Sequence, residues 1–72
     1  MSKSMQTKEY KEFSKKLRQA RTEAGLTQVQ VAGKLKRPQS YISNIEAGEQ
    51  RVDITELKVF AKLYKKKVDY FI

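Results

Sequence analysis

Residues 25–48 decide the fold of this chain, and they read GLTQVQVAGKLKRPQSYISNIEAG. Thr27 is a good helix N-cap, and Gln30 three residues later completes a capping-box pattern. Pro38 is tolerated only in the first turn of a helix, so it marks the start of a second one. The stretch therefore predicts two short helices joined by a tight turn, one from Thr27 to about Lys36 and one from Pro38 to about Ala47.

Apolar side chains at helical spacing predict further helices on both sides of this pair. The stripe before it consists of Tyr10, Phe13, Leu17, Ala20 and Ala24. After a loop at residues 49–52, Asp53 can cap a helix whose apolar face consists of Ile54, Leu57, Phe60, Ala61 and Tyr64. The expected fold is an all-α compact bundle of four to five short helices. Residues 1–8 are expected to form a flexible arm, and residues 9–72 one domain with a C-terminal dimerisation segment.

Composition limits the classes of partner. The chain of 72 residues has 16 Lys and Arg and 8 Asp and Glu, which gives a net charge of +8. This charge favours nucleic acid or an anionic membrane as the partner. A merely soluble basic surface is the alternative. Without Cys or His, disulfides and most metal sites are excluded, and neither metal nor cofactor is expected. The chain has no apolar run of membrane-spanning length and no signal peptide, so a cytoplasmic protein without a membrane partner is expected.

The second helix of the pair presents a polar face. If Ile42 and Ile45 point inward, four side chains lie on the opposite side: Gln39, Ser40, Ser43 and Asn44. Gln and Asn can bond adenine through two hydrogen bonds, and Ser can serve several bases. Ordinary surface residues are the alternative for any one of the four. Together, on the second of two short helices joined by a tight turn, the four residues predict a helix-turn-helix whose second helix reads the DNA major groove.

Residues around the two helices are expected to contact DNA phosphates, namely Gln28, Tyr41, Lys36, Arg37 and Arg51. Tyr41 lies between the two faces of its helix, so it either bonds a phosphate or closes the edge of the core. Glu46 is an acid on a surface that should face phosphates, and it therefore needs a cation. Arg21 on the preceding helix is the expected partner, in a largely buried ion pair.

At these positions the chain resembles the Xre/Cro-type, lambda-repressor-like helix-turn-helix domain family over residues 10–72. The matching residues are Arg21, Gly25 to Gln28, Val31, Ala32, Leu35, Ser40 to Ser43, Ile45, Glu46 and Gly48. The resemblance implies a five-helix bundle that regulates transcription as a homodimer on a palindromic operator. Carried over by position, it implies base contacts from Gln39, Ser40, Ser43 and Asn44, phosphate contacts from Gln28 and Tyr41, and the buried pair Arg21–Glu46.

Four residues depart from the family pattern. Lys36 and Lys65 stand where the family usually has Gly after a helix, so a turn that favours Gly must accept a side chain or change slightly. Arg37 replaces an apolar residue and could lay its stem on the core. Pro38 replaces the common Ser or Thr cap. None of these changes removes the polar face, but together they leave the docking angle open.

The C-terminal residues Val68, Tyr70, Phe71 and Ile72 are too apolar for a free end. They either fold back on Phe60 and Tyr64 or form a dimer interface. An enzyme is not expected, because the chain has no His, no Cys and no phosphate-binding Gly-rich loop. The remaining rival is an interaction adaptor that keeps this fold without specific DNA readout. A small-molecule ligand is not inferred, and repression or autoregulation is favoured over other modes of control.

Overall fold

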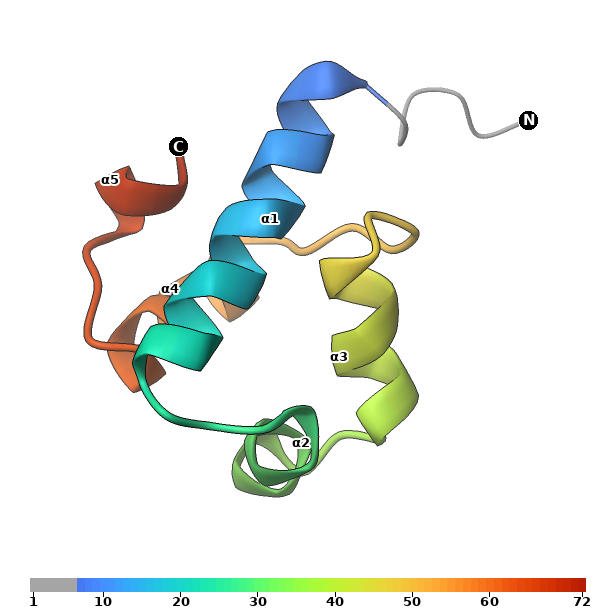
Figure 1. Ribbon diagram of the computed structural model, residues 1–72, viewed down its shortest axis with the longest axis vertical. Helices are drawn as coiled ribbons and strands as arrows, with labels where there is room; N and C mark the ends of the chain where they lie inside the picture. The colour runs from blue at the N-terminus through green and yellow to red at the C-terminus, as the bar shows by residue number, and fades with distance from the viewer. Residues whose placement is uncertain (1–6) are drawn as a thin grey trace.

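The structure is a computed structural model that describes residues 7–72, and within that range it contains five helices and no strand (Figure 1). The helices are α1 (Lys8–Glu23), α2 (Gln28–Leu35), α3 (Gln39–Glu46), α4 (Ile54–Leu63) and α5 (Val68–Phe71). The predicted all-α class is confirmed. Thr7 caps α1 through a 3.1 Å bond from the Tyr10 amide, so this helix starts inside the segment expected to be an arm. The rest of that segment, residues 1–6, lies outside the described residues.

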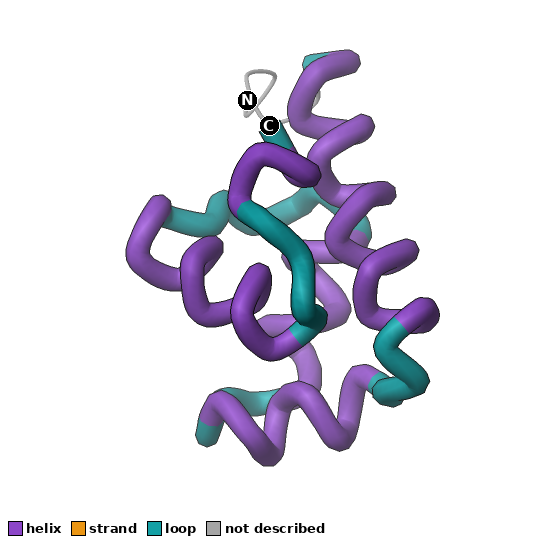
Figure 2. The backbone as a smooth tube through the Cα atoms, turned by 90° about the vertical axis from the view of Figure 1, so that its left-hand side faces the viewer, coloured by secondary structure: helices purple, strands orange, loops and turns teal. Residues whose placement is uncertain are grey.

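Helix α1 forms the long axis of the molecule, with α3 beside it and α2 across its lower end (Figure 1). Helix α4 lies behind α1 in that view, and the short α5 lies near the upper half of α1. The side view shows α2 as a separate layer at the bottom (Figure 2). Helix α3 packs against both α2 and α1, while α5 packs against α1 and α4. The two helices of the turn are thus supported from one side and open to solvent on the other.

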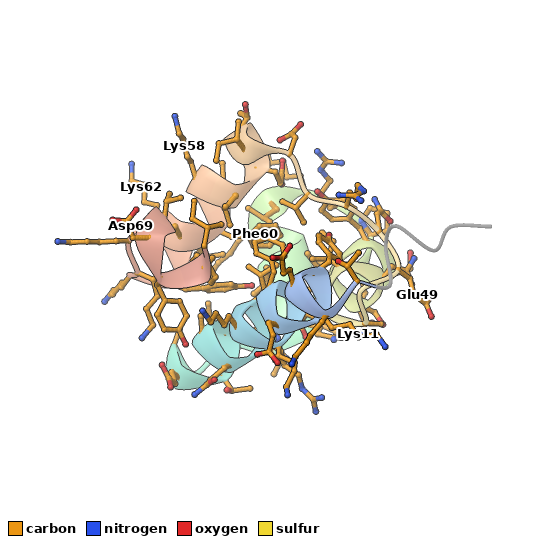
Figure 3. All side chains as sticks on the ribbon, turned by 90° about the horizontal axis from the view of Figure 1, so that it is seen from above. Lys11, Glu49, Lys58, Phe60, Lys62 and Asp69 are labelled. Atoms are coloured by element: carbon orange, nitrogen blue, oxygen red, sulfur yellow. The ribbon has the colours of Figure 1, made fainter. Side chains whose placement is uncertain are left out.

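One hydrophobic core joins all five helices. Its buried members are Leu17, Ala20, Val31, Ala32, Ile42, Ile45, Leu57, Phe60, Ala61, Tyr64 and Phe71. Phe60 lies near its centre, seen from above in Figure 3. Burying a large apolar side chain stabilises a fold by about 1.5–3 kcal/mol. Ile42 and Ile45 are buried as predicted, which fixes the rotation of α3 and leaves its opposite face outside.

Helices α1 to α4 all end in the same backbone motif. One or two residues past the end of each helix, the backbone has a positive φ: Gly25 (75°), Lys36 (57°), Gly48 (78°) and Lys65 (60°). In each case the next amide bonds back to a carbonyl five residues earlier, as Arg37 N does to Ala32 O at 2.9 Å. The chain therefore keeps the turn that favours Gly at all four ends, and two lysines adopt it at a cost of about 1–2 kcal/mol each.

Two residues of the predicted apolar faces, Ile54 and Ala24, are exposed to solvent. Ile54, which was expected on the apolar face of its helix, is 55% exposed and does not join the core. It is the first residue of α4, and its side chain lies beyond the end of the core. Ala24 is also exposed, because it is the C-cap that follows the last turn of α1.

Ser14, a polar residue of α1, is buried at 2% exposure. No hydrogen-bond partner is seen for its hydroxyl among the described residues. A Cβ added to Gly48 would lie 3.5 Å from Ser14 Oγ, so α1 and the end of α3 approach closely here. That distance is an ordinary van der Waals contact, so at Gly48 it is the positive φ of 78° that disfavours a side chain.

The C-terminal apolar residues divide between core and surface. Phe71 folds back and is buried, with its ring 6.5 Å from that of Phe13. Val68 and Tyr70 are half-buried, and Ile72 is 78% exposed. Phe71 therefore contributes to the fold of a single copy, and only the other three offer surface to a partner.

Candidate nucleic-acid interface

Helix α2 starts with the predicted capping box. The Thr27 hydroxyl accepts a 3.1 Å bond from the Gln30 amide, and the Gln30 side chain accepts a 2.9 Å bond from the Thr27 amide. Helix α3 starts differently, because Pro38 precedes it and no side chain caps its first amides. The first turn of α3 therefore keeps backbone donors for an outside acceptor.

The outer face of α3 is polar and carries no charge. Gln39, Ser40 and Asn44 are exposed, and Ser43 is half-buried. Residues four apart on a helix are neighbours, so these four side chains form one continuous patch. The patch offers amide and hydroxyl groups, which are the groups that can read base edges.

Glu46 is the only acid between residues 28 and 46, and the structure pairs it with Arg21. Arg21 Nε donates to Glu46 Oε2 at 2.7 Å, and Arg21 Nη2 donates to Glu46 Oε1 at 3.0 Å. The side chains are only 12% and 4% exposed. Hydrogen bonding to Glu46 raises the pKa of the Arg21 guanidinium above its ordinary value. The carboxylate is thus neutralised inside the domain and does not oppose an anion at the surface.

The ion pair continues into the polar face through two glutamines. Gln28 Nε2 donates to Glu46 Oε1 at 3.0 Å, which turns the Gln28 carbonyl oxygen outward. That oxygen lies 3.4 Å from Gln39 Nε2, a long hydrogen bond at the start of α3. Within residues 7–72, no partner is seen for the second N–H or the carbonyl oxygen of the Gln39 side chain. Glu46 therefore orients a residue of the outer face through Gln28.

A small polar hollow of about 290 Å³ lies between α1, α2 and α3. Its lining consists of Arg18, Arg21, Gln28, Ser43, Glu46 and Ala47. Arg18 is exposed at this place, beside two residues predicted to contact DNA. Helical spacing on α1 shows only that Arg18 lies off the apolar stripe, so its place beside the polar face could not be predicted from the sequence.

The predicted phosphate-contacting cations lie in different environments. Lys36 is exposed in the turn between α2 and α3. Arg37 Nη2 donates to Glu56 Oε1 at 3.3 Å, and its guanidinium lies 4.6 Å from the centre of the Tyr41 ring. Tyr41 is half-buried against the core, and burial raises the pKa of its hydroxyl.

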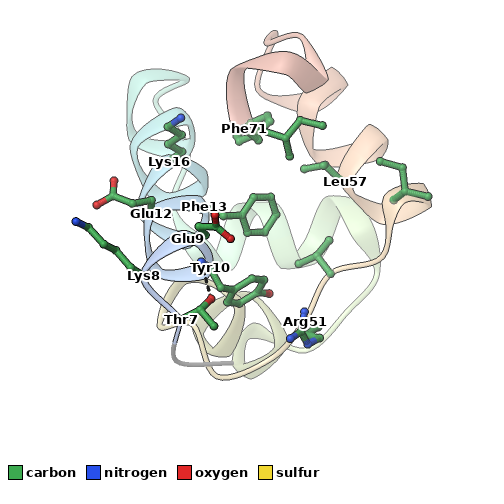
Figure 4. A pocket seen from close by; sticks show the side chains of 13 residues that line it. Thr7, Lys8, Glu9, Tyr10, Glu12, Phe13, Lys16, Arg51, Leu57 and Phe71 are labelled. Carbon is green, nitrogen blue, oxygen red and sulfur yellow. Dashed lines mark hydrogen bonds between the residues drawn. The ribbon is translucent and has the colours of Figure 1, made fainter. Parts of the chain in front are cut away.

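Arg51 lies over the ring of Tyr10, at 5.4 Å from its centre, and lines a groove next to α1 (Figure 4). Lys36 is thus an open cation beside the polar face, whereas Arg37 and Arg51 are also engaged with side chains of the domain.

Within residues 7–72, no group of three acidic, His or Cys side chains is placed to hold a metal ion. None of the helices at residues 7–72 has the length and apolar character needed to cross a membrane.

A sequence model of the helix-turn-helix domain matches residues 12–67, which is most of the chain and includes the whole polar face. The chain belongs to the Xre/Cro-like helix-turn-helix family. Membership implies DNA binding and a role in the regulation of transcription, and the family is typically not catalytic. No curated protein and no solved structure gave a match.

Proposed function

We propose that this helix-turn-helix protein is a sequence-specific transcriptional regulator, a repressor or autoregulator, that binds a palindromic operator as a homodimer in the cytoplasm. One observation carries the proposal. The exposed face of α3 is uncharged and rich in amide and hydroxyl groups, and the only acid of α2 and α3 is neutralised by Arg21. An adaptor with no DNA to read has no need to remove this single negative charge from the surface.

Gln39 is the central base reader in this proposal. With one N–H directed at Gln28, it keeps one donor and one acceptor side by side. That pair fits adenine, which offers N7 as acceptor and the N6 amine as donor in the major groove. Ser40, Ser43 and Asn44 read neighbouring bases along the same face. We therefore expect an adenine in each half of the operator, opposite the first turn of α3.

Backbone contacts flank these base contacts. Lys36 binds a phosphate from the turn, and Arg18 binds one from the rim of the polar hollow. The amide groups at the start of α2, beside Gln28, also favour an anion. Tyr41, Arg37 and Arg51 remain phosphate contacts in this proposal, with Arg37 shared between a phosphate and Glu56. Such contacts hold the protein on DNA of any sequence and make its affinity depend on salt.

A selection of binding sites from random duplex DNA, read at two salt concentrations, tests the proposal. We expect enrichment of a two-fold symmetric motif whose half-sites lie about 34 Å apart, one turn of DNA. On the selected site, the double variant Gln39→Ala/Asn44→Ala should lose the preference over random DNA. Gln19→Ala, which removes an exposed glutamine of α1, should keep it. Salt-sensitive binding without any enriched motif would contradict the proposal and favour the adaptor.

A further inference from the structure

A row of lysines runs along the outer face of α4. Lys58, Lys62 and Lys65 follow one another at spacings of four and three residues, so they lie on one side of the helix. All three residues are exposed. Figure 3 shows Lys58 and Lys62 on the side of the molecule opposite Glu49, which lies in the loop after α3. We propose that this lysine row binds the phosphate backbone of a second DNA duplex while α3 reads the first.

The positive charge of the lysine row is not neutralised by neighbouring acids. Within residues 7–72, none of the three lysines forms an ion pair, whereas the nearby Lys66 is paired with Glu23 at 2.9 Å. Glu56 is the only acid of α4, and it lies on another side of the helix, where it accepts a 3.3 Å bond from Arg37. Asp69 of α5 is exposed on the same side of the molecule as the row, as Figure 3 shows, and its single charge leaves a positive excess there.

The last position of the row holds a lysine where the backbone favours Gly. Lys65 has a φ of 60°, a left-handed conformation that disfavours a side chain. The same conformation occurs at Lys36, the exposed cation that we propose to bind a phosphate beside α3. A cation thus stands at two strained turns, one next to the polar face and one at the end of the lysine row.

The length and chemistry of the lysine row fit a nucleic-acid backbone. Seven residues of an α-helix rise by about 10.5 Å, and one DNA strand presents about three phosphates over that length. Phosphate contacts require cations and no apolar contact. A protein interface, in contrast, is built around an apolar core. Between the first and the last lysine of the row, α4 exposes a single large apolar residue, Val59, so a duplex is favoured over an acidic protein.

The directions of the two surfaces allow both duplexes to be bound at once. Because the lysine row points away from the polar face of α3, a duplex read by α3 leaves the row open to solvent. The inference rests on the proposed function, which supplies the first duplex. The protein would then hold two DNA segments together, the first by its sequence and the second by its charge alone.

Capture of a second duplex tests the inference. The selected binding site is immobilised and saturated with protein, and a labelled duplex that lacks this site is then added. The test variant replaces the lysine row: Lys58→Gln/Lys62→Gln/Lys65→Gln. The matched control removes the same charge from three exposed lysines of α1: Lys8→Gln/Lys11→Gln/Lys15→Gln. Circular dichroism verifies that both variants fold.

Wild type and control should capture the labelled duplex in a salt-dependent way. Three phosphate contacts give a slope of log affinity against log salt of about −2.7, so the affinity for the labelled duplex should fall about 40-fold from about 50 to about 200 mM salt. The lysine-row variant should bind the labelled duplex at least about tenfold more weakly at the lower salt concentration. Its affinity for the immobilised site should stay that of wild type.

Three results would overturn the inference. Wild type could capture no second duplex, and binding of polyglutamate in its place would assign the row to an acidic protein. The lysine-row variant could capture like wild type, which would assign the second duplex to the α3 of another copy. Both variants could lose capture equally, which would leave only the net charge as the cause.

Site selection separates this failure from that of the proposed function. A protein that enriches a motif but captures no second duplex refutes the lysine row alone. A protein that enriches no motif, yet captures a second duplex through the row when a random duplex is immobilised, refutes the DNA reader alone.

Discussion

Replacing Lys36 by Gly should change stability and DNA binding in opposite directions. Lys36 follows α2 with φ 57° and ψ 46°, the left-handed conformation that Gly adopts readily and a side chain does not. The same residue is an exposed cation in the turn between α2 and α3. Lys36→Gly therefore removes backbone strain together with the phosphate contact proposed for Lys36.

The two effects have different sizes. Relief of the left-handed strain is worth about 1–2 kcal/mol, and the greater freedom of Gly in the unfolded chain offsets part of it. A net gain of about 1 kcal/mol raises the unfolding temperature of a domain of this size by about 4–8 °C. Each lost phosphate contact reduces the slope of log affinity against log salt by about 0.9 per copy.

Lys65→Gly provides the control. Lys65 ends α4 with φ 60° and the same hydrogen-bond pattern, but it lies outside the helix-turn-helix. Thermal unfolding followed by circular dichroism, together with binding titrations at four salt concentrations, should give two stabilised variants of which only Lys36→Gly has a reduced salt slope. A Lys36→Gly protein that unfolds below wild type refutes the backbone argument. Equal slopes for the two variants refute the phosphate contact.

Other substitutions test separate parts of the interface. Gln39→Ala should lose about 1–3 kcal/mol on the selected site and little on random DNA, measured by fluorescence anisotropy; equal losses on both would remove Gln39 from the base readers. Glu46→Ala should destabilise the domain by about 3 kcal/mol in urea unfolding, because it leaves Arg21 largely buried without its partner, and an unchanged midpoint would contradict this. Lys66 holds the pKa of Glu23 below its ordinary value through a 2.9 Å ion pair. The pair therefore stabilises the fold at a pH above the ordinary pKa of a Glu side chain, and this contribution is lost as the pH falls through the lowered pKa. Glu23→Gln should therefore flatten the acid side of the stability profile, and an unaltered profile would show that solvent screens the pair.

The local features of the fold could be predicted from the sequence because they depend on neighbours along the chain. The capping box of Thr27 and Gln30 needs only a separation of three residues, and the positive φ of Lys36 is one of the two outcomes expected where Lys replaces the Gly that the family usually has. The contact of Arg21 with Glu46 spans 25 residues, yet a lone acid near a DNA-reading face had few possible partners. The need of an acid for a cation restricted the possible partners of Glu46, although the separation along the chain did not.

Features that depend on how a loop lies in space could not be predicted. The exposure of Ile54 and the bond from Tyr10 to the Gln50 carbonyl both follow from the path of the loop after α3. Ser14 is buried on α1 close to Gly48, and no helical pattern in the sequence shows this contact. The groove belongs to the same class, since its walls come from both ends of the chain.

The guanidinium of Arg21 has a consequence for the motions of the domain. It also donates to the Leu26 carbonyl at 2.9 Å, so one side chain ties the end of α1, the entry to α2 and the end of α3. Local opening of α2 or α3 must break these hydrogen bonds of Arg21. We therefore expect the amide protons of both helices to exchange with solvent only when the whole domain unfolds. In the proposed function, these bonds of Arg21 would hold α2 and α3 in one relative arrangement before they contact DNA.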